Sequence, residues 1–294
     1  MYLGGRSTSK GSMSTVAKQP FELLGADGGP LRGEVRTAGG GSDRPAVIIC
    51  HGFKGFKDWG FFPYLADRLA RAGMTVISFN FSGSGVGPDG ESFTEPERFG
   101  HATLSNDQSD LQLVVTALKE GTLSDGLAKH CAYGLFGHSR GGGTAILHAA
   151  GTDSVKAMVT WAATAKPLRW DDATVARWLS EGRMDVVDQR TGDVLPLYTD
   201  FLNDLSARGH ELDIAQAARR VRAKWLIVHG AEDEAIPYGD AMELHVAAQP
   251  TVAELTMVPG AGHTFGARHP WAGYTPELNA AFEATVGWFS GNLL

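Results

Sequence analysis

The feature that most constrains the fold is an alternation, from residue 45 onward, of short apolar runs with longer amphipathic segments. The runs are rich in β-branched residues and bounded by glycines, and amphipathic helices are predicted over 61–73 and 105–121, the second capped by Ser105 or Asn106. This alternation predicts an α/β fold, doubly wound around a mostly parallel sheet. The six predicted strands cover 45–50, 74–81, 131–137, 155–161, 224–229 and 254–258.

The alternation breaks between residues 164 and 222. This stretch carries two helical pieces, at 171–182 and 213–222, around a hairpin-like turn at 188–196. It is predicted to be a small inserted cap. Upstream, the turn signal ADGGP splits two strand-like runs, which predicts an antiparallel edge hairpin over 20–38. The predicted organisation is a disordered leader at 1–19, an α/β core at 20–163 and 223–294, and a cap at 164–222.

Charge and hydropathy exclude several classes of partner. The net charge is −7 and no run of Lys or Arg reaches five residues, which argues against nucleic acid. No apolar stretch approaches the roughly 20 residues needed to span a bilayer. The N-terminus lacks the apolar centre of a secretory signal, so a cytoplasmic location is expected. Cys50 and Cys131 have no metal or redox spacing, and oligomeric state is not readable from the sequence.

Residues 137–141 read Gly-His-Ser-Arg-Gly and match the G-x-S-x-G nucleophile elbow. The pattern alone is weak, but a predicted strand precedes it and a helix rich in small residues follows it. The glycines permit a sharp strand-to-helix turn that would expose the Ser139 hydroxyl at a helix N-terminus, where developing negative charge is stabilised. Ser139 is therefore the predicted nucleophile.

A serine nucleophile needs a base and an acid that orients the base. In the chain order Ser, acid, His, each residue follows a strand. The loop after the strand at 224–229 offers Glu232, Asp233 and Glu234, and the loop after the last strand offers His263. His269 is the only serious rival base.

Acyl transfer also needs hydrogen-bond donors for the oxyanion. The backbone N–H of Arg140 and that of Phe53, in the loop after the first parallel strand, are the predicted donors. Aromatic and apolar residues near that loop, in the predicted cap and beside the acidic loop suggest a pocket for an apolar or aromatic group. The predicted pocket residues are Phe56, Trp59, Leu168, Trp170, Trp178 and Ile236.

Together these motifs resemble the α/β-hydrolase superfamily, and within it small bacterial carboxylesterases related to cinnamoyl and feruloyl esterases. The resemblance rests on HGF at 51–53, FNFSGSG at 79–85, GHSRGG at 137–142, HGAEDEAIP at 229–237 and GAGHTF at 260–265. It implies Asp233, rather than Glu232 or Glu234, as the triad acid. Two features depart from the family: Arg140 replaces the Met, Gln or Leu often found after the nucleophile, and the cap matches no substrate class.

The predicted function is hydrolysis of small-molecule carboxylic esters with short, medium or aromatic acyl groups through an acyl-enzyme, with no metal or organic cofactor. A serine peptidase or amidase of the same fold is one alternative, and a non-catalytic ligand-binding relative is another. An Asp-nucleophile dehalogenase or epoxide hydrolase is disfavoured by Ser139. A dinucleotide site at FSGSGVGPDG is excluded because Pro88 stands at the third glycine position and no helix opens there; this segment is predicted to be a surface loop near the pocket.

Overall fold

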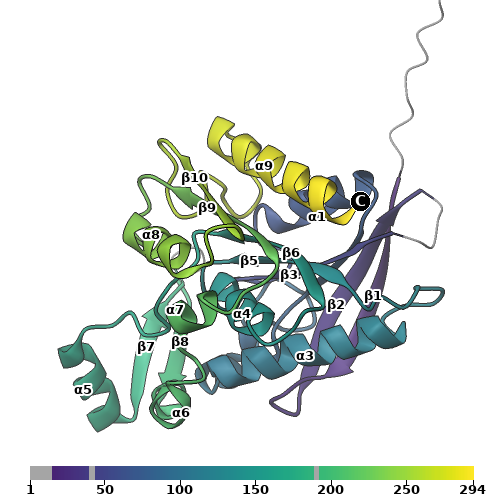
Figure 1. Ribbon diagram of the computed structural model, residues 1–294. Coiled ribbons are helices and arrows are strands. Elements are labelled where there is room, and N and C mark those ends of the chain that lie inside the picture. The colour runs from purple at the N-terminus through teal and green to yellow at the C-terminus, as the bar shows by residue number, and fades with distance from the viewer. Residues whose placement is uncertain (1–14, 40–43, 189–191) are drawn as a thin grey trace, which may run out of the picture.

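An eight-stranded sheet forms the centre of the computed structural model, which describes residues 15–39, 44–188 and 192–294. Its strand order is β1-β2-β4-β3-β5-β6-β9-β10 (Figure 1). β1 pairs antiparallel with β2, β2 pairs antiparallel with β4, and the remaining neighbours are parallel. The strands are β1 (Val16–Leu24), β2 (Pro30–Ala38), β3 (Ala46–Cys50), β4 (Thr75–Phe79), β5 (Tyr133–His138), β6 (Val155–Trp161), β9 (Lys224–Gly230) and β10 (Ala253–Val258).

The prediction of a mostly parallel sheet is confirmed. All six strands predicted from residue 45 onward are present, with ends displaced by two residues or fewer. β3, β4 and β5 are buried along their whole length, as expected for parallel strands covered on both faces. The predicted edge hairpin is also present, but β1 begins at Val16. Residues 16–19, predicted to belong to a disordered leader, are therefore in the strand, and residues 1–14 lie outside the described residues.

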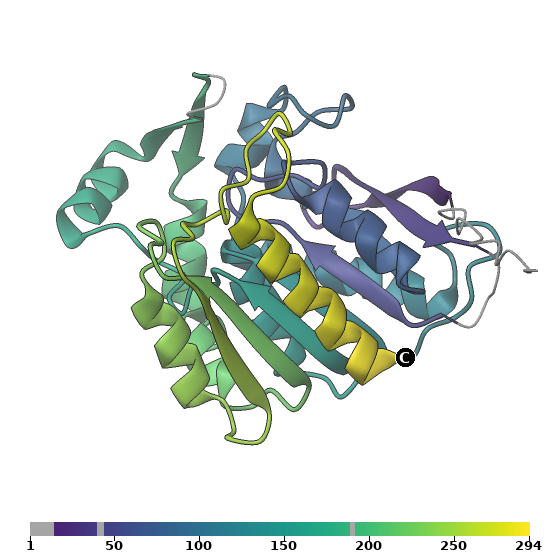
Figure 2. The same cartoon turned by 90° about the horizontal axis from the view of Figure 1, so that it is seen from above.

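Helices cover both faces of the sheet, as Figure 2 shows from above. α1 (Phe62–Arg71) and α9 (Pro276–Leu293) pack against one face, and α3 (Leu104–Glu120), α4 (Arg140–Ala149), α7 (Ile214–Ala218) and α8 (Tyr238–Ala247) pack against the other. α3 is capped by Thr103, whose side chain accepts from the Asn106 N–H, and not by Ser105 or Asn106 as predicted. Two short helices, η1 (Ser82–Ser84) and α2 (Pro96–Gly100), follow β4.

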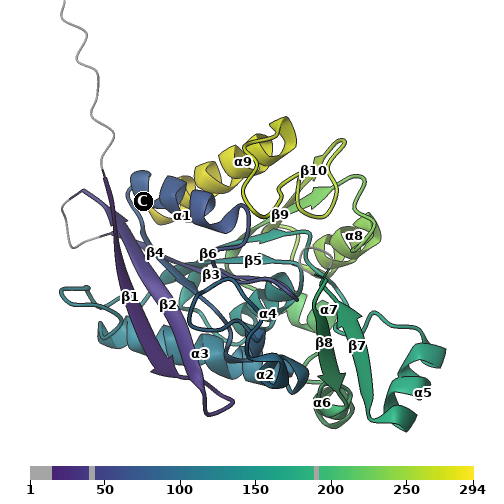
Figure 3. The ribbon, with the colours of Figure 1, turned by 180° about the vertical axis from the view of Figure 1, so that it is seen from behind.

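The described residues of 164–222 lie mostly beside the sheet, beyond the carboxyl ends of its parallel strands (Figure 3). They contain α5 (Asp172–Glu181), the antiparallel pair β7 (Arg183–Val187) and β8 (Val194–Tyr198), α6 (Asp200–Arg208) and α7. α6 was not predicted. α7 is shorter than the helical piece predicted over 213–222, and its Ile214 and Ala217 join the main core against the sheet.

Hydrophobic side chains form two large clusters, one on each face of the sheet, and a third cluster beneath residues 164–222. The third cluster joins Trp178, Leu195 and Phe201 of this segment to Phe56 and Phe99 of the loops that follow β3 and β4. The segment is thereby held over the edge of the sheet where the strands end. In the part of the chain that the structure describes, no helix is both long and apolar enough to cross a membrane.

Candidate active site

Ser139 stands between β5 and α4 in a strained backbone conformation, with φ 57° and ψ −122°. Its N–H donates to the carbonyl of Trp161 on the neighbouring strand at 2.9 Å. A Cβ on Gly141 would lie 2.2 Å from the carbonyl oxygen of His51, and one on Gly137 would lie 2.4 Å from the carbonyl oxygen of Gly141. The turn therefore needs both glycines, and it places the Ser139 hydroxyl at the N-terminus of α4.

His263 lies within hydrogen-bond reach of Ser139, with 3.1 Å between its Nε2 and the serine Oγ. It belongs to the loop after β10. The backbone of this loop is held by His138, whose Nε2 lies 3.0 Å from the His263 carbonyl oxygen. Burial lowers the pKa of His138 to about 3, so its ring is neutral and donates Nε2–H to that carbonyl. His138 thus supports the loop and does not compete for the Ser139 proton.

Asp233 orients the other side of the His263 ring, with Oδ2 2.8 Å from Nδ1. Its Oδ1 accepts from the N–H groups of Ala235 and Ile236, both at 2.9 Å. Burial alone would raise the pKa of Asp233, but the hydrogen bond and charge of His263, with the Ile236 N–H, bring it below its ordinary value. A carboxylate at Asp233 favours the tautomer with hydrogen on Nδ1, which leaves Nε2 to accept from Ser139.

The other acids in this loop do not make this contact. Glu232 and Glu234 are exposed, whereas Asp233 is buried. The loop is closed by His229 at the end of β9, because its Nε2 lies 2.8 Å from the Ile236 carbonyl oxygen. The rival base His269 lies elsewhere: its Nδ1 accepts from the Gly60 N–H at 3.0 Å, and its ring stacks on Trp59.

The loop after β3 passes directly beside Ser139. A Cβ on Gly52 would lie 3.0 Å from the Ser139 Cβ. His51 holds the loop, since its Nε2 accepts from the Phe81 N–H at 3.1 Å and its Nδ1 lies 2.9 Å from the Gly52 carbonyl oxygen. Burial lowers the pKa of His51 to about 4, which keeps the ring neutral for these two roles. Phe53 therefore follows directly after a turn that is held beside Ser139. From this position its backbone N–H was predicted to donate to the oxyanion.

Two cavities meet at Ser139, and both are also lined by His263, Phe53 and Lys54. The larger, of about 360 Å³, extends toward residues 164–222. The smaller, of about 240 Å³, extends toward Trp59 and Thr264. The further residues that line the larger cavity are Leu104, Arg140, Thr164, Pro167, Arg169, Trp170, Phe201, Ile214, Ala235 and Ile236.

The predicted pocket residues separate into two groups. Trp170 and Ile236 line the larger cavity, and Trp59 lines the smaller one. Phe56, Leu168 and Trp178 line neither cavity. Phe56 and Trp178 are fully buried in the third hydrophobic cluster, and Leu168 packs against that cluster. Sequence reasoning missed the cavity residues Leu104, Arg169, Phe201 and Ile214, which carry no local motif and meet only in the folded chain.

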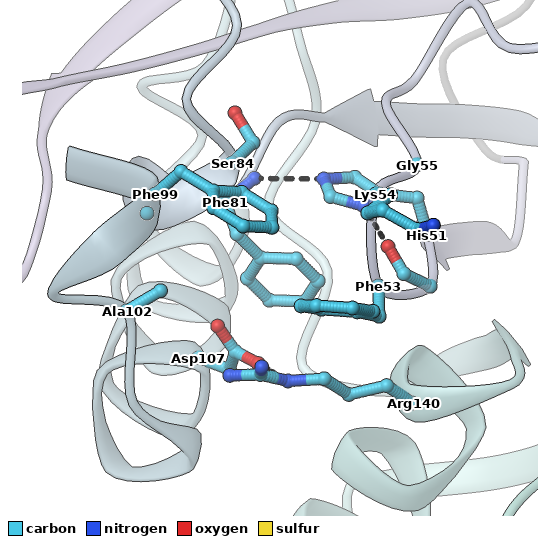
Figure 4. Close-up of a pocket in the computed structure, with 12 residues that line it drawn as sticks. His51, Phe53, Lys54, Gly55, Phe81, Ser84, Phe99, Ala102, Asp107 and Arg140 are labelled. Atoms are coloured by element: carbon cyan, nitrogen blue, oxygen red, sulfur yellow. Dashed lines mark hydrogen bonds and ion pairs between the residues drawn. The ribbon is translucent and has the colours of Figure 1, made fainter. Parts of the chain in front are cut away.

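Arg140 also lines a small cavity, of about 30 Å³, beside the loop after β3 (Figure 4). Its Nε donates to Asp107 Oδ2 at 2.8 Å, and its guanidinium carbon lies 5.1 Å from the centre of the Phe201 ring. Burial raises the pKa of Asp107 to about 6, although the Arg140 charge opposes this effect. Gly83 and Ser84 also line this cavity and are buried, so the surface loop predicted at FSGSGVGPDG is wrong over these residues.

Nothing in the described ranges 15–39, 44–188 and 192–294 forms a group of three or more His, Cys, Asp or Glu side chains able to hold a metal ion. The polar groups around Ser139 are instead a hydroxyl, an imidazole, a carboxylate and backbone N–H groups. Such a set suits proton transfer and nucleophilic attack on a carbonyl.

Comparison with known proteins identifies the family. A family model described as "Alpha/beta hydrolase family" matches residues 47–276. A search of curated protein sequences found no match.

Several solved structures share the fold at low sequence identity. Est1E from Butyrivibrio proteoclasticus, solved with ferulic acid bound, has a TM-score of 0.71 at 20% identity, covering 92% of this chain and 98% of that one. A putative hydrolase from Agrobacterium vitis S4 has a TM-score of 0.70 at 18% identity, covering 93% and 99%. A puromycin-hydrolyzing peptidase from Mycobacterium tuberculosis has a TM-score of 0.61 at 19% identity, covering 95% of this chain but 39% of the peptidase.

Proposed function

Because this chain belongs to the α/β-hydrolase family, we propose that it is a serine esterase in which Ser139 attacks the carbonyl carbon of a carboxylic ester. The observation that carries this proposal is the hydrogen-bonded series from Ser139 Oγ through His263 to Asp233, set at the N-terminus of α4. A hydroxyl, a base and an orienting carboxylate in this order are the arrangement that nucleophilic acyl transfer requires.

In the proposed reaction, His263 takes the Ser139 proton as the serine oxygen bonds to the carbonyl carbon. The N–H groups of Phe53 and Arg140 stabilise the oxyanion. The intermediate expels the alcohol, which receives the proton from His263, and leaves an acyl-enzyme. Water, deprotonated by His263, then attacks the acyl carbon and releases the acid. Asp233 stabilises the imidazolium that forms in both steps.

The apolar lining of the larger cavity supports an ester with an aromatic or medium-length acyl or alcohol group. Trp170, Phe201 and Ile236 supply much of this lining. The structural neighbour solved with ferulic acid points to an aromatic acyl group as a first choice for assay. Methyl ferulate and p-nitrophenyl butyrate together cover the two possibilities.

The test of the proposal combines labelling with kinetics. We expect a fluorophosphonate to modify the folded protein at Ser139, as located by peptide mass spectrometry. Replacing Ser139 with alanine should abolish the label and lower kcat on p-nitrophenyl butyrate by at least about 10⁴-fold, with the circular dichroism spectrum unchanged. Absence of an adduct at Ser139 in the folded wild type would favour the non-catalytic alternative.

Peptidase or amidase activity is the second candidate, and the fold shared with the puromycin-hydrolyzing peptidase favours testing it. The same acyl group presented as an ester and as an anilide separates the two. An esterase should turn over the ester with no comparable rate on the anilide, whereas an amidase protonates the poorer amine leaving group efficiently and cleaves both.

A further inference from the structure

The larger cavity carries positive charge on a wall whose other residues are mostly apolar, apart from Ser139, Thr164 and His263. Lys54, Arg140 and Arg169 line it, and of the described residues no Asp or Glu does so. The smaller cavity, by contrast, is lined by Lys54 and Asp188. The two sides of Ser139 therefore differ in the charge that they present to the two halves of a substrate.

Arg169 is the cation best placed to meet a ligand. Its Nη1 donates to Asp240 Oδ2 at 2.7 Å and lies 3.4 Å from Thr164 Oγ1, and its side chain is 30% exposed. Asp240 is buried and also accepts from the Ala165 N–H at 2.8 Å. The Arg169 guanidinium is thus fixed in place through one nitrogen, and its Nε and Nη2 make no hydrogen bond within the described residues.

Arg140, which lines the same cavity, adds to its positive charge. Its Nε is paired with Asp107 and its guanidinium packs against Phe201, while its Nη2 is buried without a hydrogen-bond partner in the described part of the chain. The acidic partners of the two arginines, Asp107 and Asp240, do not line the cavity. An anion in the cavity would therefore be nearer to the arginines than to their acidic partners, so attraction would exceed repulsion.

A neutral substrate would cover the Nε and Nη2 donors of Arg169 without giving them hydrogen-bond partners, which is costly. A carboxylate matches the planar guanidinium and forms charge-assisted hydrogen bonds with it. We propose that the preferred substrates are esters that carry a free carboxylate on the half that enters the larger cavity, with Arg169 as the residue that binds it. This proposal rests on the esterase function proposed above and specifies its substrate class.

The carboxylate could sit on the acyl half or on the alcohol half of the ester, and two pairs of substrates distinguish these sources. Monomethyl adipate is compared with methyl hexanoate for the acyl half, and 4-acetoxybutyrate with butyl acetate for the alcohol half. Hydrolysis is followed by titration of released acid at constant pH. We expect kcat/KM to be at least about tenfold higher for the charged member of one pair, with the ratio falling as ionic strength rises.

Substitutions assign the preference to Arg169. In Arg169→Met the ratio of charged to neutral kcat/KM should fall to about one, and Arg169→Lys should restore part of it because the charge is kept without the planar fork. Lys166→Met is the matched control: Lys166 belongs to the same segment, is 65% exposed and does not line the cavity, so the ratio should not change. The ratio is measured within each variant, which separates substrate preference from loss of folded protein.

The possible outcomes distinguish failure of the proposed carboxylate preference from failure of the proposed esterase function. Equal or faster hydrolysis of the neutral member in both pairs by the wild type would overturn the inference and leave the esterase function intact. A charge preference that survives in Arg169→Met would overturn the assignment to Arg169. Absence of hydrolysis of every ester, together with absence of labelling at Ser139, would remove the esterase function and the inference with it.

Discussion

Ser139 has a φ of 57°, in a region that costs a residue with a side chain about 1–3 kcal/mol. Tertiary contacts hold this conformation, since the Ser139 N–H is bonded to the Trp161 carbonyl and the elbow packs against the loop after β3 at Gly141. The residue proposed to react is one of four described non-glycine residues with positive φ; the others are Lys54, Ala162 and Phe265. The position of the Ser139 hydroxyl therefore depends on the space left by the neighbouring glycines.

We predict that Gly141→Ala prevents the elbow from forming. Its Cβ would lie 2.2 Å from the His51 carbonyl oxygen and 2.5 Å from that of Cys50, both backbone atoms that cannot move aside. The expected result is a loss of at least about 3 kcal/mol in the free energy of unfolding and loss of fluorophosphonate labelling. Urea denaturation measures the first. Gly287→Ala, in α9 with open space around it, is the control and should stabilise by about 1 kcal/mol.

The raised pKa of Asp107 predicts that the stability of the folded chain depends on pH. This pKa is about 6 in the folded chain against 3.8 ordinarily, so the folded state binds this proton more tightly than the unfolded state. The stability that this group contributes is greatest below pH 3.8 and decreases as the pH rises through about 6, by about 3 kcal/mol in all. Urea denaturation of the wild type and Asp107→Asn at pH 4, 5, 6 and 7 should show the wild type losing stability relative to the variant over this range. Parallel profiles would contradict the prediction.

Some site residues could be predicted from the sequence because strand ends position them. Parallel strands bring their carboxyl ends to one edge of the sheet, so Ser139, His263 and one acid of the loop at 232–234 were expected to meet there. The choice of Asp233 came from the family resemblance. Arg169 could not be predicted, since Asp240, which holds it, is 71 residues away and no periodicity links the two. The prediction that Phe56 and Trp178 line the pocket was wrong for a related reason. An aromatic residue close to a site in the sequence is as well suited to a hydrophobic core as to a cavity wall.

At the scale of elements, the strands were easier to predict than the insertion. The parallel strands are continuous apolar runs, whereas residues 164–222 form short elements that bury only part of each surface. α6 carries Phe201 and Leu202 as its only fully buried residues, which is too weak a pattern to mark a helix. The role of this segment as a cap over the site remains a proposal, supported by Pro167, Arg169 and Trp170 in the cavity wall.

Substitution of Trp170 tests whether residues 164–222 act as a cap over the site. The Trp170 ring lies edge-on to Phe53, with centroids 6.3 Å apart, and contacts Trp178 and Phe201. In Trp170→Ala we expect kcat/KM for p-nitrophenyl octanoate or methyl ferulate to fall about tenfold, because apolar contact with a large substrate is lost. For p-nitrophenyl acetate the fall should be less than about threefold. Leu179→Ala, exposed on α5, is the matched control, and an equal loss on large and small esters in Trp170→Ala would refute the role.

At the scale of the whole molecule, burial is concentrated around the sheet. The two clusters on its faces contain residues from every parallel strand and from the long helices α1, α3, α4 and α9. The third cluster connects residues 164–222 to the loops after β3 and β4. Within that segment, α5 buries only Trp178, and β7 has no fully buried residue. The proposed site therefore lies between a rigid sheet and a less firmly packed segment.

This difference predicts the pattern of amide hydrogen exchange. Strands such as β3 and β5, buried throughout, should exchange only when the whole chain unfolds, whereas α5 and β7 should open locally because few apolar contacts hold them. We expect amides in α5 and β7 to exchange at least about a hundredfold faster than those in β5, which corresponds to about 2.8 kcal/mol in opening free energy. Exchange followed by mass spectrometry of peptides measures this directly. If α5 were as well protected as β5, the segment would belong to the same cooperative unit as the sheet, and the prediction would be wrong.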